Sequence, residues 1–148
     1  MMAGQEVSKN ILINNNLSEI ERLSKAVAEF GKKNNLAGEV IYDIRLALEE
    51  VVSNIIKYGY EDDYDHKIAV HMNWQSESVT MQIKDDGKPF NPLEIKSANL
   101  KRQFGEREPG GMGIHIVRKL MDKILYKREE GNNVLQLTKY LADHAIDQ

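Results

Sequence analysis

The sequence has no cysteine among its 148 residues. This absence excludes disulfide bonds and thiol catalysis, and it fits a reducing compartment. Long apolar runs are missing as well: nowhere do 18 apolar residues follow one another, so neither a membrane span nor membrane association is expected. The first residues supply neither the basic nor the apolar segment of a secretory signal. We therefore expect a cytoplasmic protein.

An excess of positive charge is also absent. The chain carries 20 Lys and Arg against 23 Asp and Glu, for a net charge of -3, and its basic residues are scattered. Direct nucleic-acid binding is therefore not expected. Histidine is scarce, and the four histidines lack the spacing of a metal site, so we expect them at surface or satisfied core positions: His66, His71, His115 and His144.

What the sequence does contain is the pattern of one α+β domain over residues 1–148, a length that suffices to bury a core. Helices grouped between runs of strands predict a two-layer sandwich, in which one mixed, mostly antiparallel sheet is covered by three helices. The hydrophobic spacing predicts these elements in chain order: a strand at 9–14, helices at 18–33 and 39–58, strands at 67–74 and 78–84, a helix at 113–121, and strands at 124–128 and 134–140.

Local signals mark the ends of these elements. Ser18 and Glu21 have the spacing of a capping box at the start of the first helix, and Gly59 is expected to cap the end of the second. Residues 130–133, Glu-Gly-Asn-Asn, predict a hairpin turn. Residues 91–109 are charged and lack a sustained period, which is typical of a functional loop.

The second helix carries a polar stripe apart from its apolar side. Glu50 and Asn54 lie one turn apart, so their side chains are neighbours, whereas Glu49 points away from Asn54 and is the weaker candidate. Beside a phosphate site, an Asn oxygen suits Mg²⁺, and a carboxylate can orient or deprotonate an attacking hydroxyl. The alternative interpretation is that both side chains simply face solvent.

Two glycine-containing segments follow this helix. The turn Asp85–Phe90 ends a strand, where a carboxylate can accept a hydrogen bond from an exocyclic amine such as that of adenine, and Gly87 leaves room for the ring. The alternative is an ordinary Asp-Gly turn. The segment Gly110–Gly113 precedes an apolar helix, where backbone N–H groups can approach an anion. It is neither a Walker loop nor a Rossmann fingerprint, and the alternative is a simple loop end.

With these segments in this order, the chain resembles the GHKL ATP-binding superfamily, which has the Bergerat fold, and within it the anti-sigma-factor serine/threonine kinases. The resemblance covers about residues 9–141, and Asn54–Gly59 matches the family's Asn-Ala-x-Lys-His/Tyr-Gly pattern. It implies that residues 91–109 form a lid over the nucleotide. Pro109 stands where some of these kinases carry a basic residue, and Arg107 is the nearest substitute.

The resemblance also implies roles for individual residues. Glu50 would be the general base and Asn54 the Mg²⁺ ligand and a nucleotide contact. Asp85 would bind the adenine amine and Gly87 the face of the ring. The remaining implied nucleotide contacts belong to the phosphate side: Lys57, Tyr58, Arg107, Gly111, Met112 and Gly113.

The implied activity is that of a serine/threonine protein kinase that uses ATP and Mg²⁺. Such a kinase acts as an anti-sigma factor: it phosphorylates a STAS-type antagonist and sequesters a sigma factor. Family members commonly pair, which leaves a homodimer open. The alternative is an ATP-binding switch that sequesters a partner without phosphoryl transfer, and a further one is an α+β domain that binds nothing in these segments. A detached histidine-kinase module is disfavoured, because no histidine precedes His66.

Overall fold

The computed structural model describes residues 7–91 and 111–141. Its elements are β1 (Ser8–Asn14), the short 3-10 helix η1 (Leu17–Glu19), α1 (Ile20–Lys33), α2 (Gly38–Tyr58), β2 (Lys67–Gln75), β3 (Ser78–Asp85), α4 (Gly111–Leu120), β4 (Lys123–Glu129) and β5 (Asn132–Tyr140). The strands form one sheet in the order β1-β2-β3-β5-β4, and each of these pairings is antiparallel. Within the described residues, no helix is both long and apolar enough to cross a bilayer.

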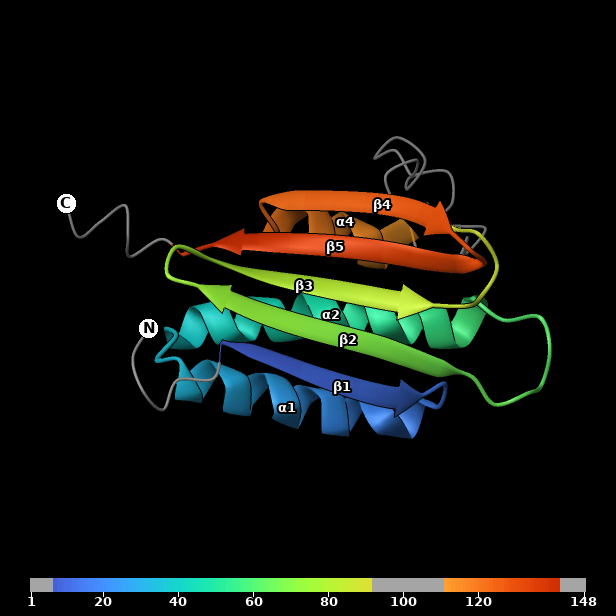
Figure 1. The fold of residues 1–148 in the computed structure, drawn as a ribbon, viewed down its shortest axis with the longest axis horizontal. Coiled ribbons are helices and arrows are strands. Elements are labelled where there is room, and N and C mark those ends of the chain that lie inside the picture. Colours follow the sequence, from blue (N-terminus) through green and yellow to red (C-terminus); the bar gives the residue numbers. More distant parts are fainter. Residues whose placement is uncertain (1–6, 92–110, 142–148) are drawn as a thin grey trace.

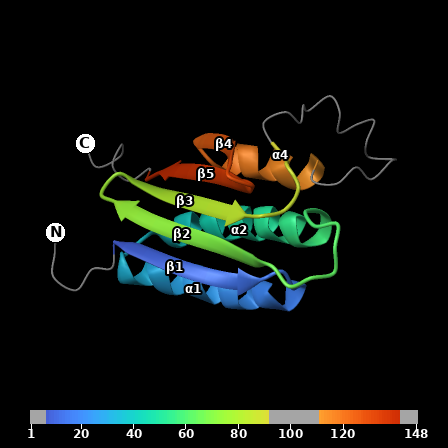
Figure 2. The ribbon, with the colours of Figure 1, turned by 45° about the vertical axis from the view of Figure 1, so that its right-hand side comes forward.

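The helices cover a single face of the sheet. In Figure 1 the strands run across the front and α1, α2 and α4 lie behind them, and the turned view of Figure 2 shows the same two layers. The predicted α+β sandwich is therefore confirmed, with a sheet whose described pairings are all antiparallel rather than mixed.

Strict alternation in the central strands builds the core between the two layers. The inward residues of β2 and β3 are at most 1% exposed: Ile68, Val70, Met72, Val79, Met81 and Ile83. They share the core with the buried stripe of α2: Val40, Ile44, Ala47, Leu48, Val51 and Val52. Each large apolar side chain buried in this way contributes about 1.5–3 kcal/mol. The core therefore holds the ends of α2 and β3 in fixed positions.

The start of α1 differs from the predicted capping box. Asn16, and not Ser18, is the capping residue, and it caps the 3-10 helix η1 that precedes α1: its Oδ1 accepts a hydrogen bond from the backbone N–H of Ser18 at 3.0 Å. Residues 17–19 form the 3-10 turn η1, so α1 begins only at Ile20. Glu21 then lies in the first turn of α1 and pairs with Lys25 at 3.8 Å instead of reaching back to a cap.

The hairpin between β4 and β5 is tighter than predicted. Its turn consists of Glu130 and Gly131, which have φ values of 52° and 82°. Two consecutive positive φ values are typical of the two-residue turns that match the twist of a hairpin. Asn132 and Asn133 therefore belong to β5, and the register places Asn133 directly opposite Asp85 of β3.

The functionally interesting segments meet at one end of the molecule. The end of β3, the end of α2 and the β4–β5 turn all lie on the right in Figure 1, and Figure 2 brings this end forward. The antiparallel sheet and the helix α2 behind it thus bring residues that are distant in sequence to the same end of the molecule.

Candidate functional site

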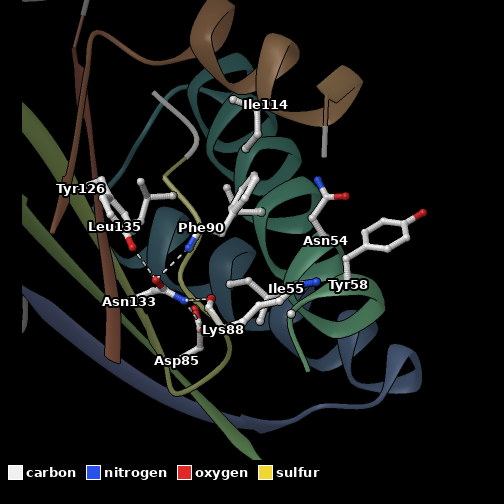
Figure 3. Close-up of a pocket in the computed structure, with 12 residues that line it drawn as sticks. Asn54, Ile55, Tyr58, Asp85, Lys88, Phe90, Ile114, Tyr126, Asn133 and Leu135 are labelled. Atoms are coloured by element: carbon white, nitrogen blue, oxygen red, sulfur yellow. Dashed lines mark hydrogen bonds between the residues drawn. The ribbon is translucent and has the colours of Figure 1, made fainter. Parts of the chain in front are cut away.

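A pocket of about 220 Å³ opens at this end. Its walls are mainly apolar and come from α2, α4, β4 and β5: Val51, Ile55, Ile114, Tyr126 and Leu135. A few polar side chains converge on it. As Figure 3 shows, Asn54 and Tyr58 of α2 lie on one side, and Asp85, Asn133 and Tyr126 lie on the other. An apolar pocket with a small number of fixed polar groups is the usual form of a small-molecule site.

Asp85 is the buried charge of this pocket, with only 4% of its surface exposed. Its Oδ1 accepts hydrogen bonds from the backbone N–H of Gly87 at 2.8 Å and from Nδ2 of Asn133 at 3.1 Å. The other oxygen, Oδ2, accepts none from the residues that the structure describes. Burial raises the pKa of Asp85, and these two hydrogen bonds oppose the rise. Asp85 thus offers one fixed, poorly solvated acceptor to a ligand that donates.

Asn133 holds Asp85 in place and is itself fully engaged. Its Nδ2 also donates to the carbonyl of Lys88 at 2.8 Å. Its Oδ1 accepts from the Tyr126 hydroxyl at 2.6 Å and from the Phe90 N–H at 3.2 Å. Both donor hydrogens and both acceptor positions of the amide are used. Asn133 therefore positions Asp85 and has no hydrogen-bonding capacity left for a ligand.

Gly87 is required by the packing of the turn against the end of α2. A Cβ at Gly87 would lie only 2.5 Å from the carbonyl oxygen of Gly59. That same oxygen accepts the N–H of Lys88 at 2.8 Å, and Arg128 Nη1 donates to the Gly87 carbonyl at 2.8 Å. No side chain fits between the two backbones. The close approach of α2 and the turn explains the glycine without reference to a ligand.

Glu50 and Asn54 meet the first turn of α4 at Gly113. A Cβ on Gly113 would lie 2.6 Å from Asn54 Nδ2 and 2.8 Å from Glu50 Oε1. The two side chains predicted to be neighbours therefore share one surface, against a glycine that leaves them room. Glu49 points elsewhere, as its helical position predicts: it accepts from Ser24 Oγ on α1 and lies 3.7 Å from Arg45.

The remaining residues that the resemblance assigns to the phosphate side do not all line the pocket. Tyr58 lines the pocket and is 42% exposed, whereas Lys57 is exposed and is not part of its lining. Gly111 begins α4, with Met112 next, so these glycines form the first helical turn instead of the predicted preceding loop. Arg107 and the predicted lid, apart from Asn91, lie outside the described residues.

Reasoning from sequence missed most of the pocket wall. The missed residues are ordinary apolar or aromatic positions in the sequence, and only the fold brings them together: Phe90, Ile114, Tyr126 and Leu135. Asn133 was assigned to the hairpin turn. Its position at the start of a strand next to a two-residue Glu-Gly turn is the signal that could have revealed it.

Comparison with known proteins agrees with this arrangement. The family model of the histidine kinase-like ATPase domain matches residues 13–139. The serine/threonine-protein kinase BtrW of Bordetella bronchiseptica is 27% identical over 101 residues, covering 68% of this chain and 71% of that one. The serine-protein kinase RsbW of Listeria innocua is 25% identical over 119 residues, covering 74% and 72%. The anti-sigma F factor of Bacillus subtilis is 28% identical over 128 residues, covering 85% and 88%.

A solved structure shares the fold. The crystal structure of the RsbU and RsbW domains of Rv1364c from Mycobacterium tuberculosis superimposes with a TM-score of 0.63 at 16% identity. The match covers 90% of this chain and 32% of that longer chain. The family match over residues 13–139 confirms the resemblance inferred from the three sequence segments, and with it ATP binding as the property of the domain. The chain belongs to the histidine kinase-like ATPase domain family.

Proposed function

We propose that this protein is an ATP-dependent serine/threonine kinase of the anti-sigma-factor type. It transfers a phosphoryl group from Mg-ATP to a STAS-type antagonist and sequesters a sigma factor, and the cytoplasm is its proposed compartment. The observation that carries the proposal is the buried Asp85 with an oxygen left for a ligand, across the pocket from Asn54 (Figure 3). The names of the relatives, serine-protein kinase and anti-sigma F factor, support the class of activity. A homodimer stays a prediction of the family resemblance.

At the adenine end, Asp85 reads the base. Its Oδ1 is occupied by Gly87 and Asn133, so Oδ2 is left to accept a hydrogen from the exocyclic amine of adenine. Guanine carries a carbonyl oxygen at that position of the ring, which would face the carboxylate without a hydrogen between them. We therefore expect the pocket to favour ATP over GTP.

At the phosphate end, Glu50 and Asn54 provide the reacting groups. The Asn54 amide oxygen suits Mg²⁺, which takes few protein ligands together with phosphate oxygens and water. When bound, Mg²⁺ neutralises the charge of the phosphates. Glu50 would orient the serine hydroxyl of the antagonist and accept its proton as the oxygen attacks the γ-phosphorus and the bond to ADP breaks. The first turn of α4, at Gly113, closes this end beside both side chains.

Phosphoryl transfer is tested by a pair of adjacent variants. Glu50→Gln should bind ATP with unchanged affinity but lose transfer to the antagonist by about a hundredfold or more, since a base contributes about 10²–10⁴-fold. Glu49→Gln is the matched control, because Glu49 bonds to Ser24 on α1, and it should transfer at the wild-type rate. Transfer is measured with radiolabelled ATP and a serine-bearing STAS-type antagonist. A wild type that binds ATP and this partner but transfers nothing would favour the non-catalytic switch.

A further inference from the structure

His66 lies between two carboxylates. Its Nδ1 is 3.0 Å from Asp86 Oδ1, and its Nε2 is 2.8 Å from Asp62 Oδ1. An ionised carboxylate only accepts hydrogen bonds, so both ring nitrogens must carry a hydrogen, and only the imidazolium form does. The His66 side chain is 15% exposed, whereas those of Asp62 and Asp86 are 43% and 53% exposed. The geometry therefore favours the protonated form of His66.

The groups that face this ring come from two segments of the chain. Asp62 and Tyr60 belong to the loop after α2, and Asp86 belongs to the turn after β3. The Tyr60 ring stacks on the imidazole with a centroid separation of 4.2 Å. The hydrogen bond to Asp62, chiefly, and the charge of Asp86 raise the pKa of His66 above its usual value, although burial opposes them. Protonation of His66 thus joins the two segments.

Asp86 connects this cluster to the nucleotide pocket. It stands between Asp85, the proposed adenine acceptor, and Gly87, whose N–H fixes Asp85 Oδ1. His66 is anchored from behind as well. Its N–H donates to Asn15 Oδ1 at 3.1 Å, and its carbonyl accepts the Asn15 N–H at 3.0 Å. The imidazolium therefore binds the turn 85–87 through Asp86, and the backbone of His66 is itself fixed by its hydrogen bonds to Asn15.

We propose that protonated His66 is a positioning residue for the adenine end of the pocket, so that nucleotide affinity falls as the pH rises and His66 loses its proton. This inference rests on the proposed function, because it takes the Asp85 pocket as the nucleotide site. Once the ring is neutral, one carboxylate faces a nitrogen lone pair, and the turn that carries Asp85 loses a tether. The sign is that of a group with a raised pKa: the stabilisation is present at low pH and disappears as the pH rises through that pKa.

The first test measures the dissociation constant of Mg-ADP by calorimetry between about pH 6 and about pH 8.5, a range that spans the ordinary histidine pKa. From low to high pH, the wild type should lose about fivefold more affinity than His66→Gln, a coupling at the low end of the usual range. The comparison cancels titration of the ADP phosphates, which both proteins share. His71→Gln is the matched control and should follow the wild type, since His71 lies on β2 and contacts the neutral Asn10 Oδ1 at 2.7 Å.

The second test needs no folded variant. Because linkage is reciprocal, Mg-ADP should raise the pKa of His66 in the wild type by about 0.7, the logarithm of that fivefold factor, as followed by NMR of the ring protons. If ADP binds and the His66 pKa stays the same with and without it, the inference is overturned while the proposed function stands. If ADP fails to bind at every pH, the proposed function fails first.

Discussion

At the residue scale, burial of the Asp85 carboxyl group destabilises the ligand-free protein. Its pKa is raised by burial, which means that the surroundings disfavour its charged form. Asn133 and Gly87 satisfy one oxygen and leave the other to the pocket. A buried, incompletely bonded carboxyl group in an apolar cavity is consistent with a partner that donates a hydrogen bond.

The variant Asp85→Asn separates the cost of burying the Asp85 charge from the hydrogen bond that Asp85 offers to a ligand. The Asn oxygen can still accept from Gly87 and Asn133, but an NH₂ group replaces Oδ2 and faces the amine of adenine donor to donor. We expect ATP affinity to fall by about tenfold or more, as for the loss of a hydrogen bond to a charged group. The preference over GTP should narrow, and the Tm of the ligand-free protein should stay equal or rise. Calorimetry with both nucleotides and a thermal melt measure this, and unchanged ATP affinity would contradict the adenine assignment.

The same residues show what a sequence reveals about a site. Asp85 and Gly87 are neighbours in the chain, so their turn is visible as a local pattern. Asn133 is 48 positions from Asp85 and reaches it only through strand register. The two-residue turn between β4 and β5 leaves Asn133 in β5, and the pairing of β5 with β3 places it opposite Asp85. A shift of that pairing by one residue would reverse which side chains face the pocket. Local patterns therefore drew attention to Asp85, the proposed acceptor, and missed Asn133, which holds it.

At the element scale, the first turn of α4 contains Gly113 where it approaches α2. A Cβ on Gly113 would meet the far ends of the Glu50 and Asn54 side chains, which are flexible and can move aside. A methyl group there would displace the proposed base and metal ligand without opening the core. Gly31 of α1 is the contrasting case, because its Cβ would lie 2.4 Å from Cγ1 of Ile41, packed at the α1–α2 contact.

Three alanine variants test this distinction. Gly113→Ala should reduce phosphoryl transfer by about a hundredfold, because small misplacements of reacting groups have effects of that size, and should alter stability by less than about 1 kcal/mol. Gly31→Ala should lower the free energy of unfolding by about 1–3 kcal/mol through overpacking, and the folded protein should retain its activity. Gly38→Ala meets nothing within 4 Å and is the neutral control. Denaturant unfolding and the transfer assay give both quantities, and equal activity in all three variants would refute the role of Gly113.

Most elements could be predicted because the spacing of apolar residues shows directly which face of a helix or strand is buried. The core stripe of α2 and the alternation of β2 and β3 appear as expected. Helix starts were less accessible. Before α1, residues 17–19 form a 3-10 turn capped by Asn16, so the predicted capping box at Ser18 does not form. At α4 the helix includes Gly111, a residue with low intrinsic helix propensity, because packing against α2 outweighs propensity.

At the scale of the whole molecule, ligand binding should appear as thermal stability. Mg-ATP at about a hundred times its dissociation constant should stabilise the fold by about 2.7 kcal/mol, which corresponds to a Tm increase of roughly 5–10 °C. Asn54→Ala should lose most of this increase, because Asn54 lines the pocket and is the proposed Mg²⁺ ligand. A thermal melt with and without nucleotide is sufficient. An absent shift at millimolar Mg-ATP in the wild type would contradict nucleotide binding itself.

The one-sided layering of the fold has a practical consequence. Leu12 of β1 is 56% exposed and lies between the inward-facing Ile11 and Ile13, so its side chain stands on the sheet face away from the described helices. Since the chain has no cysteine, Leu12→Cys would introduce the sole thiol of the molecule. A dye or a surface linker attached there would label one defined atom on the face opposite the helices, leaving the pocket open for single-molecule or immobilised-kinase measurements.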